Sequence, residues 1–127
     1  MTLDEIMKSL YYKKETYFLD IFGKIKRNQT TLYADRNNCR SEQHIQQWLL
    51  INDLLNVSAY LNGDWTPDWN DPSSEKHTLC VREGKVVPVA VSEPCHIVYF
   101  KDADTAAEAL RILGEPALRQ ILSGTGA

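Results

Sequence analysis

The sequence predicts an α+β fold: a small antiparallel sheet of about three strands with helices packed on one face, in the order α-α-β-β-β-α-α. Three observations lead to this class. The first half of the chain contains two long stretches with helical apolar periodicity, short β-branched runs follow between residues 77 and 101, and the last part contains helix caps. We expect residues 1–43 to form an amphipathic helix and a polar loop, and residues 44–127 a compact α+β domain.

The first predicted helix covers residues 3–26, with Thr2 as its N-cap. Its apolar stripe consists of Leu3, Met7, Leu10, Tyr17, Ile21 and Ile25, at spacings of three, four or seven. Residues 27–41 are polar and are expected to form a long loop. Because the rest of the chain is too small to cover this stripe fully, we expect an oligomer, a homodimer, through the N-terminal helix. The alternative is that the helix packs on its own domain.

Three further helices are predicted. One runs from Ser41 to Leu61, is apolar on two faces and ends at Asn62-Gly63. Another is capped by Asp102 or Asp104 and ends at Gly114. The last covers residues 117–122.

The predicted sheet lies between these helices. Residues 77–82 and 85–91 flank Glu83-Gly84, which is typical of a two-residue hairpin. Pro88 makes the second run an edge strand or a bulge, because it lacks an N–H for the ladder. Residues 95–101 are predicted as the third strand.

Residues 64–72 hold two of the three tryptophans in a segment that Pro67 and Pro72 keep out of regular helix. Each indole brings about 200 Å² of mostly apolar surface. One interpretation is a structural plug, in which both rings pack over the Trp48, Leu49 and Tyr60 end of the preceding helix, and Trp48 with one of them is buried. The other is a partner-binding surface, made of Trp65, Asp68, Trp69, Asn70 and Asp71.

Catalytic and metal-binding patterns are not found in the sequence. The acidic tryptophan segment imitates the spacing of a calcium loop, but Trp69 stands where glycine must make the turn. His77 and Cys80 are three apart on a predicted strand, so they face opposite sides of the sheet. There is no nucleophile elbow, phosphate loop or H-E-x-x-H motif. We therefore expect no enzyme activity, no metal and no cofactor.

Charge is unevenly distributed along the chain. Residues 1–40 hold eight Lys/Arg against five acids, a net charge of +3, and residues 41–127 hold six against twelve, a net charge of −6. The acidic part should repel phosphate, which makes nucleic-acid binding unfavourable. The alternative function is nevertheless a nucleic-acid-associated protein using the basic residues Lys24, Lys26, Arg27, Arg36 and Arg40.

The segment Trp65-Thr66-Pro67-Asp68-Trp69, followed by short strands and by a strand that leads into a helix, resembles a group of small uncharacterised proteins. Bacteriophages, prophages and conjugative elements of gut anaerobes encode them, and they carry a W-x-P-[DN]-W segment. The resemblance implies a mobile-element origin and an accessory role in the host cytoplasm. We expect a non-enzymatic protein that binds an unknown host protein and inhibits or modulates a system such as antiviral defence or replication.

Three cysteines form no close pairs, which favours reduced thiols in a cytoplasm. The chain also lacks an apolar run of the roughly 20 residues that a membrane-spanning helix requires, so we expect no membrane association.

Overall fold

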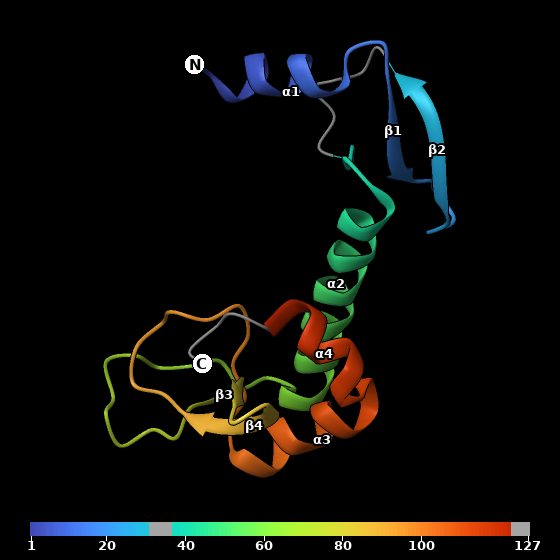
Figure 1. Ribbon diagram of the computed structural model, residues 1–127. Coiled ribbons are helices and arrows are strands. Elements are labelled where there is room, and N and C mark those ends of the chain that lie inside the picture. Colours follow the sequence, from blue (N-terminus) through green and yellow to red (C-terminus); the bar gives the residue numbers. More distant parts are fainter. Residues whose placement is uncertain (31–36, 123–127) are drawn as a thin grey trace. The chain divides into compact units, whose positions relative to one another are not determined.

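The structure is a computed structural model that describes residues 1–30 and 37–122 (Figure 1). The α+β class is confirmed, but the strands form two separate two-stranded antiparallel sheets, so the predicted three-stranded sheet and element order are wrong. The chain divides into two compact units, Met1–Leu49 and Leu50–Ala127. In the described residues the elements follow in the order α1, β1, β2, α2, β3, β4, α3, α4.

The N-terminal helix is much shorter than predicted. Helix α1 spans Leu3–Tyr11, and the N-cap hydroxyl of Thr2 accepts a hydrogen bond from the Glu5 N–H at 3.1 Å. The helix ends because the chain turns extended at Tyr12 and left-handed at Lys13, which has φ +57°. The prediction of helix over residues 3–26 is therefore wrong beyond Tyr11.

Residues 14–30 form a β-hairpin instead. Strand β1 spans Lys14–Leu19 and pairs antiparallel with β2, Ile25–Thr30. Asp20 builds the turn between them, since its Oδ1 accepts the N–H groups of Phe22 at 2.8 Å and Lys24 at 3.0 Å. The spacing of Tyr17, Ile21 and Ile25 suggested a helix, but Ile21 lies in the turn and Ile25 is the one apolar residue of β2. The Asp20 turn reverses the chain within the predicted helix.

A short return of the chain completes the first unit. The N–H and C=O of Tyr17 pair with the C=O and N–H of Cys39 at 3.0 and 2.7 Å, on the edge of β1 opposite β2. Residues 27–41, predicted as one loop, thus contain most of β2 and this bridge. Among the described residues of this unit, Tyr11, Thr16, Cys39 and Ile45 are buried. Burial raises the pKa of the Cys39 thiol.

Helix α2 spans Glu42–Asn62, close to the predicted bounds. The Ser41 hydroxyl accepts the His44 N–H at 3.1 Å, as an N-cap does. Ile45 and Leu54 on this helix are both fully buried, in agreement with its broad apolar surface. Among the described residues, no helix combines the length and apolar character that crossing a membrane requires.

The second hairpin agrees with the prediction. Strand β3 spans His77–Arg82 and pairs antiparallel with β4, Lys85–Ala90. Glu83 and Gly84 connect them with φ values of +50° and +78°, as a two-residue turn of type I′ requires. The predicted third strand at residues 95–101 is wrong, because this segment forms a single bridge, between His77 and Phe100.

Two helices complete the second unit. Helix α3 spans Ala103–Leu113, capped by Asp102 and ended by Gly114 at φ +87°, and α4 spans Glu115–Leu122. Both pack against the β3–β4 hairpin. The buried core of this unit consists of Leu54, Leu79, Val86, Val98, Phe100, Ala106, Ala109, Leu118 and Leu122.

We expect Asp102→Ala to destabilise the protein by about 1 kcal/mol at pH 7, because it removes the N-cap of α3. Hydrogen bonds from the Thr105 side chain and backbone hold the pKa of the Asp102 carboxyl below its usual value. A lowered folded-state pKa gives stability that is present above the unfolded-state pKa of about 3.9 and is lost as the pH falls through the folded-state value. Urea unfolding at pH 7 and at about pH 3 should show the difference between the two proteins shrinking in acid. An equal difference at both pH values would contradict the role of the ionised carboxylate.

Candidate partner-binding loop

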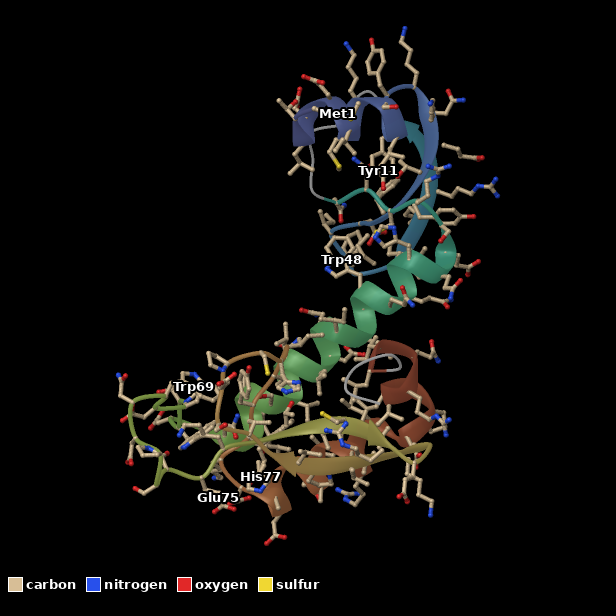
Figure 2. The ribbon with its side chains drawn as sticks, turned by 60° about the vertical axis from the view of Figure 1, so that its left-hand side comes forward. Met1, Tyr11, Trp48, Trp69, Glu75 and His77 are labelled. Atoms are coloured by element: carbon tan, nitrogen blue, oxygen red, sulfur yellow. The ribbon has the colours of Figure 1, made fainter. Side chains whose placement is uncertain are left out.

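Residues 64–76, here called the tryptophan loop, connect the end of α2 to the start of β3. Gly63 has φ +58°, a left-handed conformation that ends the helix and that side chains other than glycine's disfavour. The Trp65 N–H then donates to the Asn62 carbonyl at 3.1 Å. The loop therefore leaves α2 through a defined turn. Figure 2 labels Trp69 in this loop, with Glu75 and His77 where it enters β3.

Two successive aspartate-capped turns order the middle of the loop. Asp68 Oδ1 accepts the Asn70 N–H at 3.0 Å, and the Asp68 carbonyl accepts the Asp71 N–H at 3.3 Å. Asp71 Oδ1 accepts the N–H and hydroxyl of Ser73 at 3.0 and 2.6 Å. The hydrogen bond from the Ser73 hydroxyl has the largest effect in lowering the pKa of the Asp71 carboxyl, and the bond from the Ser73 N–H lowers it further. Both aspartate side chains therefore satisfy backbone N–H groups of the turns that follow them.

The Lys76 side chain crosslinks the tryptophan loop by hydrogen bonds to two of its carbonyl groups. This side chain is buried, with 4% of the residue's surface exposed, and its ammonium donates to the carbonyls of Asp71 at 2.8 Å and Ser74 at 2.9 Å. The ammonium also lies 5.5 Å from the centroid of the Trp69 ring, within cation–π range. One buried cation thus fixes two turns and an indole at the same time.

Trp69 attaches the loop to the segment before α3. Its ring meets the Tyr99 ring edge-on, with centroids 4.8 Å apart and an interplanar angle of 76°. The Tyr99 hydroxyl in turn accepts the His96 N–H at 2.6 Å. The loop is therefore supported on two sides, by Lys76 and by Tyr99.

The predicted burial of Trp48 together with Trp65 or Trp69 in a structural plug is wrong. Trp65 and Trp69 are half-buried, and neither belongs to the apolar core of the second unit. Trp48, in the first unit, is half-buried as well. Tyr60 is 85% exposed, so the indoles do not bury it, and Trp69 packs on Tyr99 instead.

The five residues predicted to bind a partner lie in this one ordered loop. Asp68 and Asn70 are exposed, whereas Trp65, Trp69 and Asp71 are half-buried. Asp64 and Glu75 add further exposed carboxylates, and the only lysine of the loop has its charge buried against carbonyls. The accessible face of the loop is therefore acidic, with two partly exposed indoles.

The basic residues of the alternative function lie in the first unit, where two of them are paired. Lys26 Nζ lies 3.8 Å from Asp20 Oδ2, and an Arg27 guanidinium nitrogen lies 2.7 Å from Glu15 Oε2. The hydrogen bond to Glu15 raises the pKa of Arg27. Lys24 and Arg40 are exposed, and Arg36 lies outside the described residues.

Cys95 and His96 contribute to two neighbouring hollows beside β3. One has a volume of about 380 Å³ and the other about 260 Å³; the smaller one also includes Cys80 and Glu93. Within residues 1–30 and 37–122, no group of three or more His, Cys, Asp or Glu side chains is arranged to hold a metal ion.

Comparison with protein-family models, curated proteins and solved structures gives no match for this chain. Any role for the tryptophan loop must therefore be argued from the geometry of the loop alone. Sequence reasoning missed Lys76 and Tyr99, which support the loop from β3 and from the segment before α3. A lone lysine between an acidic turn and a β-rich run was the available signal for Lys76.

We expect Lys76→Met to lower the free energy of unfolding by about 1–3 kcal/mol, because the loop carbonyls lose their donor. Amide hydrogen exchange at Ser73 and Ser74 should become faster, while Leu79 in the core stays protected. Lys85→Met changes an exposed lysine of the same unit and is the matched control. Unchanged exchange in the loop of Lys76→Met would show that Lys76 does not order it.

Proposed function

We propose that this chain is a non-enzymatic accessory protein of a phage or another mobile element, and that it acts by binding a host protein in the host cytoplasm. The tryptophan loop is the proposed docking surface. The observation that carries the proposal is the order of this loop, in which two aspartate-capped turns and the buried Lys76 ammonium hold an acidic, aromatic surface in one conformation.

An ordered loop suits recognition for an energetic reason. A surface that is already held in one conformation loses little conformational entropy on binding. Trp65 and Trp69 retain accessible surface, and tryptophan is among the residues that contribute most to interface affinity. Exposed carboxylates around them favour a basic partner surface, such as the nucleic-acid channel of a host defence or replication protein. Occupying such a channel would inhibit or modulate the host system without chemistry.

The alternative, a nucleic-acid-associated protein, has weaker support. Lys26 and Arg27 are already paired with Asp20 and Glu15 on their own hairpin, so fewer unpaired cations remain for phosphate. A steep fall of DNA affinity with rising salt would favour this alternative.

A homodimer through the N-terminal helix stays a prediction. Leu3 and Ile6 of α1 are 52% and 38% exposed, so the helix offers apolar surface. The predicted stripe is shorter, however, because Tyr17 and Ile25 belong to β1 and β2.

We expect Asp68→Lys to weaken binding to the host partner about tenfold, mainly through a slower association rate. Asp68 is exposed, so the charge change should reduce electrostatic steering while the core of the second unit stays intact. Because Asp68→Lys also removes the acceptor of the Asn70 N–H, Asp68→Asn, which keeps an Oδ1 acceptor and loses only the charge, should slow association as well. The experiment captures partners from host lysate with the full chain and measures association and dissociation rates for the captured protein. Asp53→Lys reverses an exposed charge on α2 and is the matched control. Equal association rates for Asp68→Lys and Asp53→Lys would refute the loop as the docking surface.

A further inference from the structure

The outer edge of β2 has backbone groups that point away from the hairpin. Tyr17 directs its N–H and C=O toward Cys39, on the side of β1 opposite β2. Because these directions alternate along a strand, Thr16 and Phe18 point toward β2 and bond with their partners there, Asn28 and Lys26. The intervening residues of β2 must therefore point outward.

Those outward residues are Ile25, Arg27 and Gln29. The Gln29 N–H is satisfied locally by Asn28 Oδ1 at 2.8 Å. Within the described part of the chain, the outward N–H and C=O groups of Ile25 and Arg27 have no hydrogen-bond partner. Residues 25–29 all have exposed side chains, and the register of the pair is unbroken. Such an edge is a template for an additional strand.

Strand β4 shows how the same chain closes an edge. The turn at Glu83-Gly84 makes Arg82 and Lys85 a hydrogen-bonded pair, so the alternation directs Val86 and Pro88 outward. Pro88 has no N–H to offer, and the Val86 N–H donates to Glu115 Oε1 at 3.3 Å. The β4 edge is thus blocked at two consecutive outward positions. Strand β2 contains no proline, and no side chain among residues 1–30 and 37–122 makes a comparable bond to the backbone of Ile25 or Arg27.

We propose that the outer edge of β2 binds an extended acidic segment of a partner protein by strand addition. The backbone groups of Ile25 and Arg27 would supply the hydrogen bonds. Lys26 and Arg27 are partly neutralised by Asp20 and Glu15, but residues 14–30 hold four Lys/Arg against two acids, a net charge of +2. With the exposed Lys24 at the turn, this net positive charge suits an acidic segment. At the adjoining turn, Ile21 and Phe22 are 93% and 80% exposed, and they offer apolar surface to the end of the added strand.

Charge also decides between this occupant and a second copy of the chain. Antiparallel pairing of two β2 edges around a two-fold axis at Arg27 would place the two Arg27 side chains opposite each other. Directly opposed like charges destabilise a strand pair. An acidic segment has the reverse effect, so the proposal commits to it. This surface lies in the first unit and is independent of the tryptophan loop in the second.

The first test uses two synthetic peptides long enough to span the six residues of β2, one alternating Glu with Val and the other Lys with Val. Amide hydrogen exchange on the full chain is the readout. In the free protein, the Ile25 and Arg27 amides should exchange fast, and those of Lys26 and Asn28 slowly. The acidic peptide should protect Ile25 and Arg27, and the basic peptide should not. Protection by both peptides, or by neither, would overturn the proposal.

The second test separates the backbone contribution from the charge. Arg27→Pro and Arg27→Gln both remove the guanidinium, but only proline removes the outward N–H. We expect Arg27→Pro to bind the acidic peptide about tenfold more weakly than Arg27→Gln, as the loss of one net hydrogen bond implies. Equal affinities would overturn strand addition. If Arg27→Pro does not fold, the exchange pattern of the natural chain decides alone.

Two further outcomes would count against the proposal. A thymidine oligonucleotide that shifts the Lys24 and Lys26 resonances and competes with the acidic peptide would indicate a phosphate-binding surface. A concentration-dependent dimer with protected Ile25 and Arg27 amides in the absence of peptide would assign the edge to a second copy. Asp68→Lys should leave peptide binding unchanged, so failure here and failure of the proposed function are distinguishable.

Discussion

Phe100→Ala is expected to lower the free energy of unfolding of the second unit by about 3–5 kcal/mol. Phe100 is fully buried in the core of this unit. Its backbone also joins the segment before α3 to β3, since its N–H donates to the His77 carbonyl at 2.8 Å and its carbonyl accepts the His77 N–H at 2.9 Å. Truncation would leave a cavity in the buried cluster that includes Leu54 of α2, Leu79 of β3 and Ala106 of α3.

Urea unfolding followed by tryptophan fluorescence measures this effect. Ile97→Ala removes an apolar side chain that is 46% exposed in the same segment, and it should cost far less. If the two variants are equally stable, Phe100 does not form the centre of this core.

The second large effect is expected for Asn62→Ala, at about 2–3 kcal/mol. The buried Asn62 amide donates to the Tyr99 carbonyl at 2.8 Å, and its Oδ1 accepts the Lys101 N–H at 3.1 Å. The Asn62 side chain thus bonds the backbone of Tyr99 and of Lys101, on either side of Phe100, as a neighbouring strand would. Alanine would leave the Lys101 N–H without this acceptor, although Ser58 still donates to Tyr99 at 3.2 Å.

Asn56→Ala changes an exposed asparagine of the same helix and is the control for Asn62→Ala. Loss of the hydrogen bond to Asn62 Oδ1 should also accelerate amide hydrogen exchange at Lys101. Equal stability of both variants, with slow exchange at Lys101 retained, would contradict the role assigned to the Asn62 amide.

Elements specified by local signals were predictable from the sequence. The Glu83-Gly84 turn, the Asp102 cap and the Gly114 stop each depend on the conformational preferences of one or two residues. Helix α2 was predictable because its apolar pattern is long. These signals act within a few residues, so neighbouring sequence is enough to recognise them.

The N-terminal hairpin was not predicted because its apolar residues fall at helical spacing and its strands lack strand alternation: β1 ends in three consecutive apolar residues and β2 contains one, Ile25. The left-handed Lys13 and the Asp20 turn separate the hairpin from a continuous helix, and neither residue type identifies its conformation alone. The prediction of a third strand was wrong for a different reason. Residues 95–101 have β-favouring composition, but side chains take the place of a strand ladder: Thr78 donates to the Val98 carbonyl at 2.7 Å, and Asn62 holds Tyr99 and Lys101.

The location of the candidate site was predictable from the sequence, but the contacts that hold the loop in place were not. The tryptophans, prolines and acids mark residues 64–72 in the sequence. The contact between Trp69 and Tyr99 joins residues 30 positions apart, and the burial of Lys76 depends on the surrounding fold. Such contacts have no local sequence signature, so only the structure distinguishes an ordered surface from a plug.

The most direct test of the central claim, that the tryptophan loop is the docking surface, is oxidative labelling of the full chain with and without the host partner captured in the lysate experiment. Trp65 and Trp69 are half-buried in the free protein and should therefore react. Partner binding should protect both, and the half-buried Trp48 of the first unit is the internal control. Protection of Trp65 and Trp69 with Trp48 unchanged is the predicted result. Unchanged labelling of Trp65 and Trp69 in a saturated complex would contradict the claim.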